Sequence, residues 1–477
     1  MFRTCTLAAT LLLAGPVYAQ EHAHPPAQAA APAPQTHDHA PAPQPEQPPQ
    51  QTHDGDHHPM HDGQMQHGQM QHGQMHHEMH QGPDEHAGHD MGATGSALGA
   101  YPTGRDASGT SWQPDVAEHG GVHAMAGDWM LMGHVLLNGV TDWQDGPQGD
   151  EKTFLAGMIM GAARRDFSNG GALNLRAMLA PDPLMGKRGY PLTFASGETA
   201  DGVEPLVDRQ HPHDLFMELS ASYSHRLSAT DSVFVYAGLP GEPAFGPPAF
   251  MHRLTAMDSP EAPITHHWLD STHITFGVLT AGYVHDNMKL EVSRFRGREP
   301  DEERYDIETG ALDSTAVRAS WNPTQNWSLQ ISWADVTSPE QLAPDEDETR
   351  WSASAIYARP VFDGHWAITG ALARKERSDG VDLDAWLVEA ALKPNDAWTF
   401  FGRVEDIQSD ELGGDHHGPV EDFTKASLGA IHDWRVHENA AIGLGGLVSY
   451  NWAPDALNAR YGGDQPGAMA FVRLKIG

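Results

Sequence analysis

Residues 328–335, whose sequence is SLQISWAD, decide the fold. In an extended chain, Leu329, Ile331 and Trp333 fall on one face, and small or polar residues fall on the other. Successive side chains of a β-strand point to opposite faces, so one face of this segment is apolar and the other is not. This pattern is typical of a barrel wall with lipid outside and water or packed side chains inside.

The same alternation recurs along residues 116–477 and predicts about sixteen strands, an even number of the kind that bacterial membrane barrels use. We therefore predict an all-β fold, a transmembrane antiparallel up-and-down β-barrel. The approximate spans are 126–138, 152–163, 171–180, 214–226, 232–240, 272–284, 288–297, 313–322, 327–337, 349–360, 365–374, 382–393, 398–407, 421–433, 439–450 and 467–476.

The connections between these segments alternate between short and long, which supports the barrel. Short turns are predicted at 285–287, 322–326, 362–364 and 394–396, and long polar loops at 181–213, 241–271, 298–312, 408–420 and 451–466. Short periplasmic turns and longer outer loops are what a membrane barrel requires. Trp321, Trp327 and Trp398 lie next to short turns, where they would form an interfacial aromatic girdle. A soluble periplasmic β-sandwich is the alternative.

The first nineteen residues predict a secretory signal peptide. Arg3 supplies the positive charge, residues 4–14 form a short apolar stretch, and Ala19 ends a cleavage motif. The only cysteine is Cys5, so the mature chain would have no disulfide and no thiolate metal site. Secretion and a barrel fold together predict the outer membrane of a Gram-negative bacterium.

Residues 20–115 are predicted to be a disordered tail that precedes a barrel of residues 116–477. Residues 20–100 contain fifteen of the 31 histidines, and residues 21–100 contain no Lys, Arg, Phe, Trp, Ile or Val. Such a segment buries too little apolar surface to offset the entropy lost on ordering. An even strand count places both chain ends in the periplasm, so we expect the tail there.

The tail combines two kinds of metal ligand in a short repeat that begins at Met65, Met70 and Met75. Imidazole suits divalent copper, zinc and nickel, whereas thioether is soft and suits monovalent copper. Copper in either oxidation state is therefore the predicted ion, with zinc or nickel as alternatives. A plain hydrophilic spacer is the competing interpretation. The candidate tail ligands are His57, His58, Met60, His61, Met65, His67, Met70, His72, Met75, His76, His77, Met79 and His80.

The barrel sequence carries its own candidate ligands. Met130, Met132 and His134 share the face of the first strand that is predicted to point into the lumen. Methionines that simply fill the interior are the alternative. The first very long loop ends in His211, His213 and Asp214, with Asp214 either a ligand or the acceptor that orients a histidine. The next long loop adds Met251, His252, His266, His267, Asp270 and His273.

These two loops would bring five or six histidines to one constriction if both fold into the lumen. Surface histidines without a shared role are the alternative for each position taken singly.

Charge and missing motifs limit the function classes. The net charge of −35 argues against nucleic acid as a partner. Residues 101–477 hold 54 acidic and 28 basic residues, which favours cations over anions as permeants. No Gly-x-Ser-x-Gly or His-Glu-x-x-His motif is present, so we do not expect an enzyme.

Three runs, at 211–214, 241–252 and 266–273, resemble a family of outer-membrane proteins that we associate with bacterial metal-resistance gene clusters. The tail is also similar in style, by composition only, to copper-resistance outer-membrane proteins of the B type. The resemblance implies a role in copper or heavy-metal tolerance, with outer-membrane lipid, metal ions and periplasmic copper proteins as partners. The alternatives are a general cation-favouring porin with an incidental tail and a soluble periplasmic copper-binding β protein.

Overall fold

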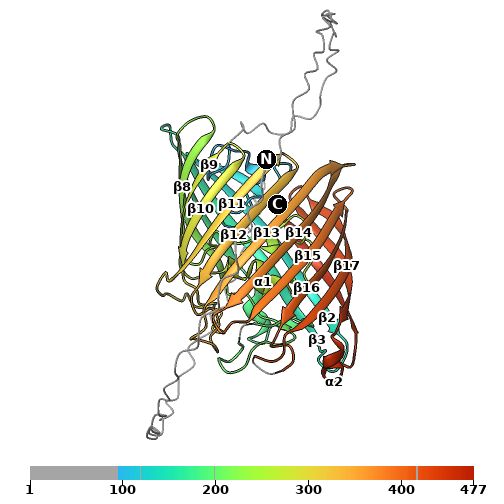
Figure 1. Ribbon diagram of the computed structural model, residues 1–477. Helices are drawn as coiled ribbons and strands as arrows, with labels where there is room; N and C mark the ends of the chain where they lie inside the picture. The colour runs from blue at the N-terminus through green and yellow to red at the C-terminus, as the bar shows by residue number, and fades with distance from the viewer. Residues whose placement is uncertain (1–94, 119, 198, 415–416) are drawn as a thin grey trace, which may run out of the picture. The chain divides into compact units, whose positions relative to one another are not determined.

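Sixteen antiparallel strands form a closed barrel in the computed structural model, which describes residues 95–118, 120–197, 199–414 and 417–477 (Figure 1). Each wall strand pairs with its neighbour in chain order, and β19 pairs with β2 to close the ring. The wall consists of β2 (Trp129–Gln144), β3 (Glu151–Asp166), β4 (Gly171–Leu179), β7 (Phe216–Arg226), β8 (Asp231–Gly238), β9 (Val278–His285), β10 (Met288–Phe295), β11 (Ser314–Thr324), β12 (Trp327–Val336), β13 (Glu348–Val361), β14 (Gly364–Arg377), β15 (Asp382–Lys393), β16 (Trp398–Ser409), β17 (Glu421–His437), β18 (Ala440–Trp452) and β19 (Gln465–Ile476).

A seventeenth, short strand, β1 (Val122–Ala126), pairs with the first residues of β2, while β19 pairs with the rest of that edge. β1 therefore continues the line of β19 along β2. The predicted first strand, 126–138, began three residues early and ended six residues early. The predicted strand ended too early because the polar residues Asp142 and Gln144 interrupt the apolar alternation. In the structure both side chains are buried in the lumen, and Gln144 donates a hydrogen bond to Asp142 at 2.9 Å.

The wall shows the alternation that the sequence predicted. In β12, Ile331 is 57% exposed on the outer face, whereas Ser332 and Ala334 are buried on the inner face. Large apolar side chains cover the outside of other strands as well, among them Leu290, Leu372, Leu428, Leu444 and Val448. In the described part of the chain, no helix is long and apolar enough to cross a membrane. The predicted transmembrane barrel is confirmed, and its apolar exterior argues against the soluble alternative.

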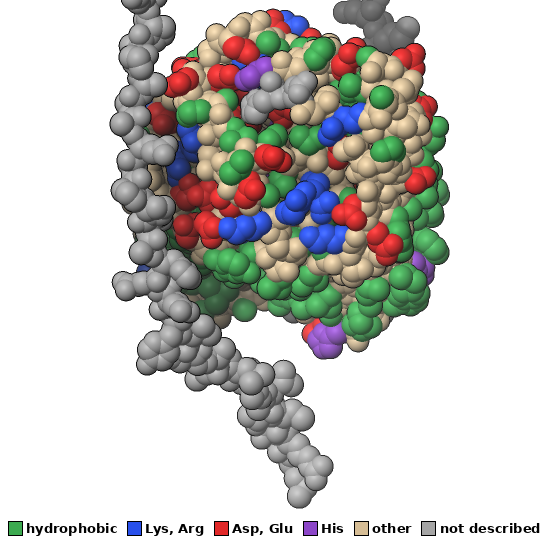
Figure 2. All heavy atoms as spheres, turned by 90° about the horizontal axis from the view of Figure 1, so that it is seen from below, with side chains coloured by type: hydrophobic (Ala, Val, Ile, Leu, Met, Phe, Trp, Pro, Cys, Tyr) green, Lys and Arg blue, Asp and Glu red, His purple; other side chains and the backbone are tan. Residues whose placement is uncertain are grey.

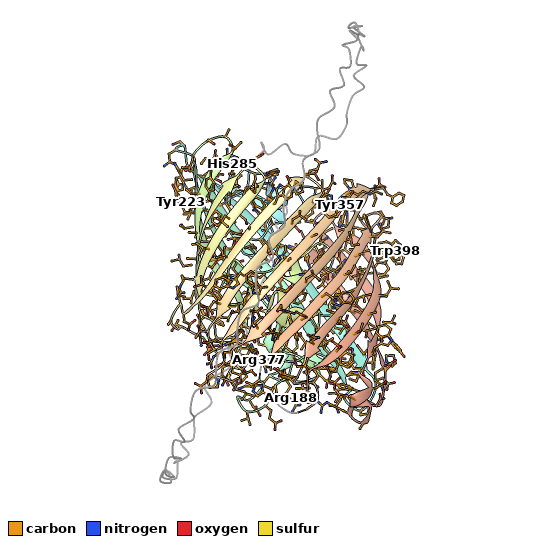
Figure 3. All side chains as sticks on the ribbon, in the orientation of Figure 1. Arg188, Tyr223, His285, Tyr357, Arg377 and Trp398 are labelled. Carbon is orange, nitrogen blue, oxygen red and sulfur yellow. The ribbon has the colours of Figure 1, made fainter. Side chains whose placement is uncertain are left out.

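Short turns and long loops lie at opposite ends of the barrel. His285, the last residue of β9 before the short turn to β10, lies at one end, and Arg188, in a long loop, lies at the other (Figure 3). Asp286 closes its turn with a φ of 53°, a conformation that Asp tolerates better than most residues. At the long-loop end, acidic and basic side chains are mixed, with apolar side chains along the rim (Figure 2).

Two long loops fold into the lumen. The first long loop, residues 180–215, contains η2 (Asp182–Met185), β5 (Tyr190–Pro191) and β6 (Arg209–Gln210). The second long loop, residues 239–277, contains η3 (Phe250–His252), α1 (His266–Leu269) and η4 (Ser271–His273). α1 lies against β13 and β14, and the apolar residues of both loops pack with inward-facing residues of the wall. The last long loop contains η5 (Asp455–Leu457) and α2 (Asn458–Tyr461).

Residues 95–115, which the composition assigned to the tail, are packed into the barrel and include η1 (Thr103–Arg105). Tyr101 and Trp112 are buried in one apolar cluster with Phe234 of β8. Arg105 is buried and pairs with Asp115 at 2.7 Å. This corrects the predicted boundary at residue 115, because two buried aromatic rings and an ion pair offset the ordering cost that the composition alone suggested.

Candidate metal centre

Five histidines from the two long loops converge inside the barrel. We call this group the five-histidine centre; it consists of His211, His213, His266, His267 and His273, all of them buried. The ring of His266 lies 5.6 Å from that of His211 and 5.1 Å from that of His273, centroid to centroid. Nitrogen atoms of His211, His213 and His266 all lie within 4.8 Å of one another, a spacing that could hold one metal ion.

Three of these rings are fixed by a hydrogen bond at Nδ1. His213 donates to Asp182 Oδ2 at 2.8 Å, and His266 donates to Asp270 Oδ1 at 2.7 Å. His273 donates to the backbone oxygen of Asp270 at 2.7 Å. Metal-bound histidines commonly make such a bond, because it selects the tautomer whose Nε2 carries the free lone pair.

Within the described part of the chain, the Nε2 atoms of the same three rings are left without a hydrogen-bond partner. Among the residues that the structure describes, none bonds Nε2 of His213, His266 or His273, and His267 has no hydrogen bond at either ring nitrogen. A buried polar atom without a partner costs about 1–3 kcal/mol. Histidines that serve only as core filling would not repeat this cost so often in one place, so the arrangement points to a ligand that accepts the lone pairs.

Burial favours the neutral form of three of these imidazoles. It holds the pKa of His211 and His273 well below the usual value, and their neighbouring imidazoles lower it further. Burial also lowers the pKa of His266, although Asp270 opposes the shift. Burial raises the pKa of Asp270, but the hydrogen bond from His266 and the charge of Arg253 outweigh it and set the value at about 2. A neutral imidazole held against an ionised carboxylate is a strong metal ligand.

Asp270 also fastens the second long loop. Its Oδ2 accepts from the backbone N–H of Phe250 at 2.9 Å and from Arg253 Nη1 at 3.1 Å. Arg253 is fully buried and forms a second ion pair with Glu389 of β15. The carboxylate that orients His266 is therefore tied to the barrel wall through one arginine.

His267 belongs to a second group, together with Glu299 and Glu340, whose ligand atoms also lie within 4.8 Å of one another. Its Nδ1 lies 3.7 Å from Glu299 Oε2. Burial raises the pKa of Glu299, but His267 and Arg350 together hold it below its usual range. The carboxylate of Glu299 thus lies at the edge of the five-histidine centre, next to His267.

Asp214 lies beside His213 in the sequence but takes a different role from the one predicted. Its described partner is Arg304, whose Nη1 lies 3.2 Å from its Oδ2. Burial raises the pKa of Asp214 to about 6, and the charge of Arg304 opposes that rise. Asp182, Asp270 and Glu299 are the carboxylates at the histidines.

The remaining barrel candidates line a neighbouring cavity of about 220 Å³. Met130, Met132 and His134 point into it from β2, as the alternation predicted, and Met251 and His252 reach it from the second long loop. The sequence did not predict the other methionines of this cavity. We call it the methionine cavity; its methionines are Met130, Met132, Met160, Met178, Met217, Met251 and Met257.

The candidate ligands of the tail, from His57 to His80, lie outside the described residues, as do the predicted signal peptide and residues 20–94. For these residues the sequence-based predictions stay predictions.

No family model and no curated protein matches the chain. Solved structures that resemble it include the OmpF protein of Salmonella typhi in complex with daunomycin, at 10% identity and a TM-score of 0.48, with 74% of this chain and 100% of that chain covered. An anion-selective porin from Comamonas acidovorans is 11% identical, with a TM-score of 0.46 and coverage of 73% and 100%. The outer membrane channel DcaP of Acinetobacter baumannii is 10% identical, with a TM-score of 0.41 and coverage of 74% and 100%.

These likenesses are weak, so the fold assignment stands on the strand pairing of the chain itself. The resemblance to metal-resistance barrels stays a prediction.

Proposed function

We propose that the chain is an outer-membrane barrel that binds transition-metal ions, copper above all, inside its lumen and thereby contributes to metal tolerance. The observation that carries the proposal is the five-histidine centre, where three buried rings have Nδ1 fixed and Nε2 unpaired among the described residues. Neutral imidazole suits divalent copper, zinc and nickel, and divalent copper binds a given set of nitrogen ligands most tightly.

The alternative is a general cation-favouring porin. It is supported by the excess of acidic over basic residues in the sequence. However, the two long loops and residues 95–118 pack inside the barrel, which favours a held ion over free diffusion through a wide pore. In the proposal, the tail sequesters copper in the periplasm, and its histidines and methionines support that role.

Thermal unfolding of the mature chain in detergent tests the five-histidine centre. An ion that binds only the folded barrel raises the unfolding midpoint, whereas ions that bind the folded and unfolded chain equally do not. We expect Cu(II), and more weakly Zn(II) or Ni(II), to raise the midpoint of the unaltered chain. The double variant His213→Ala with His266→Ala should lose this rise. His285→Ala is the matched control, because His285 is exposed at the end of β9 that lies away from the two long loops, and contacts Asp231.

An equal rise in the double variant and in the unaltered chain would refute the centre. If the double variant does not fold, His213→Asn alone serves instead, because Asn can still donate a hydrogen bond to Asp182 but offers no imidazole.

Deletion of residues 21–93 tests the role of the tail in cells. We expect copper tolerance to fall while small-solute uptake stays unchanged, because the deletion removes ligands and leaves the barrel. Unchanged tolerance would assign the tail to the alternative, an incidental segment on a porin.

A further inference from the structure

The methionine cavity contains a concentration of sulfur that packing alone does not explain. Seven methionines from strands and the second long loop line this one space of about 220 Å³. Protein interiors are normally close-packed, with few voids larger than a water molecule, and methionine is the side chain best able to fill irregular gaps. Flexible side chains that surround a void without filling it leave room for an ion and its ligands.

The wall aligns these donors in a row. His134 of β2 is the register partner of Met160 of β3, and Met160 is the partner of Met178 of β4. Directly opposite residues on neighbouring strands have Cβ atoms about 4.5–5.5 Å apart, close enough for their side chains to share a ligand. His252, from the second long loop, closes the row, with Nε2 lying 3.3 Å from Met178 Sδ.

The donor chemistry differs from that of the neighbouring centre. Thioether sulfur is a soft, uncharged ligand that suits monovalent copper and similar ions better than hard divalent ones. Residues 95–477 contain no cysteine, so thioethers are the only soft side-chain donors that the barrel has. Glu218, the nearest acidic side chain to this row in register, is engaged with Arg176 at 2.7 Å.

The methionine cavity adjoins the five-histidine centre at His273. His273 lines the cavity, and its ring lies 5.1 Å from that of His213. On another side the cavity is bounded by residues of the 95–118 segment, among them Asp106 and Gln113. The two groups of ligands therefore meet at one imidazole.

We propose that Met160 and Met178, flanked by His134 and His252, form a binding site for a soft monovalent ion, Cu(I) or Ag(I), separate from the divalent site at the five-histidine centre. This inference deepens the proposed metal-handling function by giving the lumen two sites for two classes of ion.

Silver is the probe, because Ag(I) needs no reductant, and thermal unfolding of the full mature chain in chloride-free detergent is the readout. We expect Ag(I) to raise the unfolding midpoint of the unaltered chain by linkage. The double variant Met160→Leu with Met178→Leu should lose the silver-induced rise and keep the Cu(II)-induced rise. Met to Leu changes in a core are among the best tolerated, so the variant should fold.

Met158→Leu is the matched control. Met158 lies on β3 two residues from Met160 and is buried in an apolar cluster, but it does not line the methionine cavity. It should retain both rises. A silver-induced rise that survives in the double variant, or that is absent from the unaltered chain, would overturn the site.

The variant His213→Ala with His266→Ala keeps the two proposals distinguishable. If the soft site exists, this variant retains the silver-induced rise even where the Cu(II)-induced rise is lost. A chain that responds to Ag(I) but not to Cu(II) would refute the divalent centre and leave the soft site standing.

Discussion

The five-histidine centre and the methionine cavity adjoin each other, yet they are built from different parts of the chain. The centre takes nitrogen donors from two loops, and three of its rings are aimed by a hydrogen bond to Asp182 or Asp270. The cavity takes most of its sulfur donors from wall strands, where strand register sets their spacing. The loop histidines thus depend on supporting hydrogen bonds, whereas the strand methionines are positioned by the hydrogen-bonded pairing of the strands. Substitutions of the supporting groups should therefore affect metal binding at the centre more than at the cavity.

Replacing the supporting carboxylate Asp270 should have the largest effect. Asp270→Asn removes the charge that holds His266 Nδ1–H, and loss of such an outer partner typically costs about 10–100-fold in metal affinity. We expect the Cu(II) concentration needed for half of the rise in unfolding midpoint to increase by that factor. The silver-induced rise should change less, because Met160 and Met178 lie on wall strands and only His252 belongs to the loop that Asp270 holds.

Asp270 also pairs with Arg253, so the midpoint without metal must be measured as a control. An unchanged Cu(II) response would mean that His266 does not depend on its carboxylate, and the contrast between loop and strand ligands would fail.

The same contrast explains what the sequence could predict. Period-two alternation in segments such as 328–335 predicted the wall, and the direction of Met130, Met132 and His134 followed from it. The histidines of the two long loops were also found, because imidazoles clustered in two loops are visible along the chain.

Partners that meet only in space were missed. Asp182 lies 31 positions before His213, and nothing in its local sequence signals their hydrogen bond. Met160 and Met178 were missed because alternation gives the face of a strand but not its register against the next strand. Residues 95–115 were misassigned because composition cannot show that Tyr101 and Trp112 find a cavity to fill.

Lowering the pH should weaken metal binding at the two sites to different extents. The neutral fraction of an ordinary imidazole, with a pKa near 6.5, falls about eightfold between pH 7 and pH 5.5. Burial lowers the pKa of His211, His266 and His273, so protons compete with the metal only at lower pH. We expect Cu(II) affinity at the centre to fall by much less over this range than the roughly 500-fold that three ordinary imidazoles would together lose.

The thioethers of the methionine cavity carry no proton in this range, so the silver-induced rise should change least. The measurement is the concentration dependence of each rise at the two pH values. A Cu(II) affinity that falls by hundreds of fold would show that the rings titrate as exposed imidazoles do, and the burial argument would be wrong.

The smallest effect on metal binding is expected at Asp214, which is next to His213 in sequence but paired with Arg304 in space. Asp214→Asn should leave Cu(II) affinity within about twofold, because it removes no hydrogen bond from a ligating ring. It should instead lower the unfolding midpoint without metal, since removing one partner of a buried ion pair costs up to about 3–5 kcal/mol.

Asp182→Asn should do the reverse and weaken Cu(II) binding about tenfold, because Asp182 orients His213. If the two variants weaken Cu(II) binding equally, proximity in sequence rather than a specific hydrogen bond sets the ligand strength of His213.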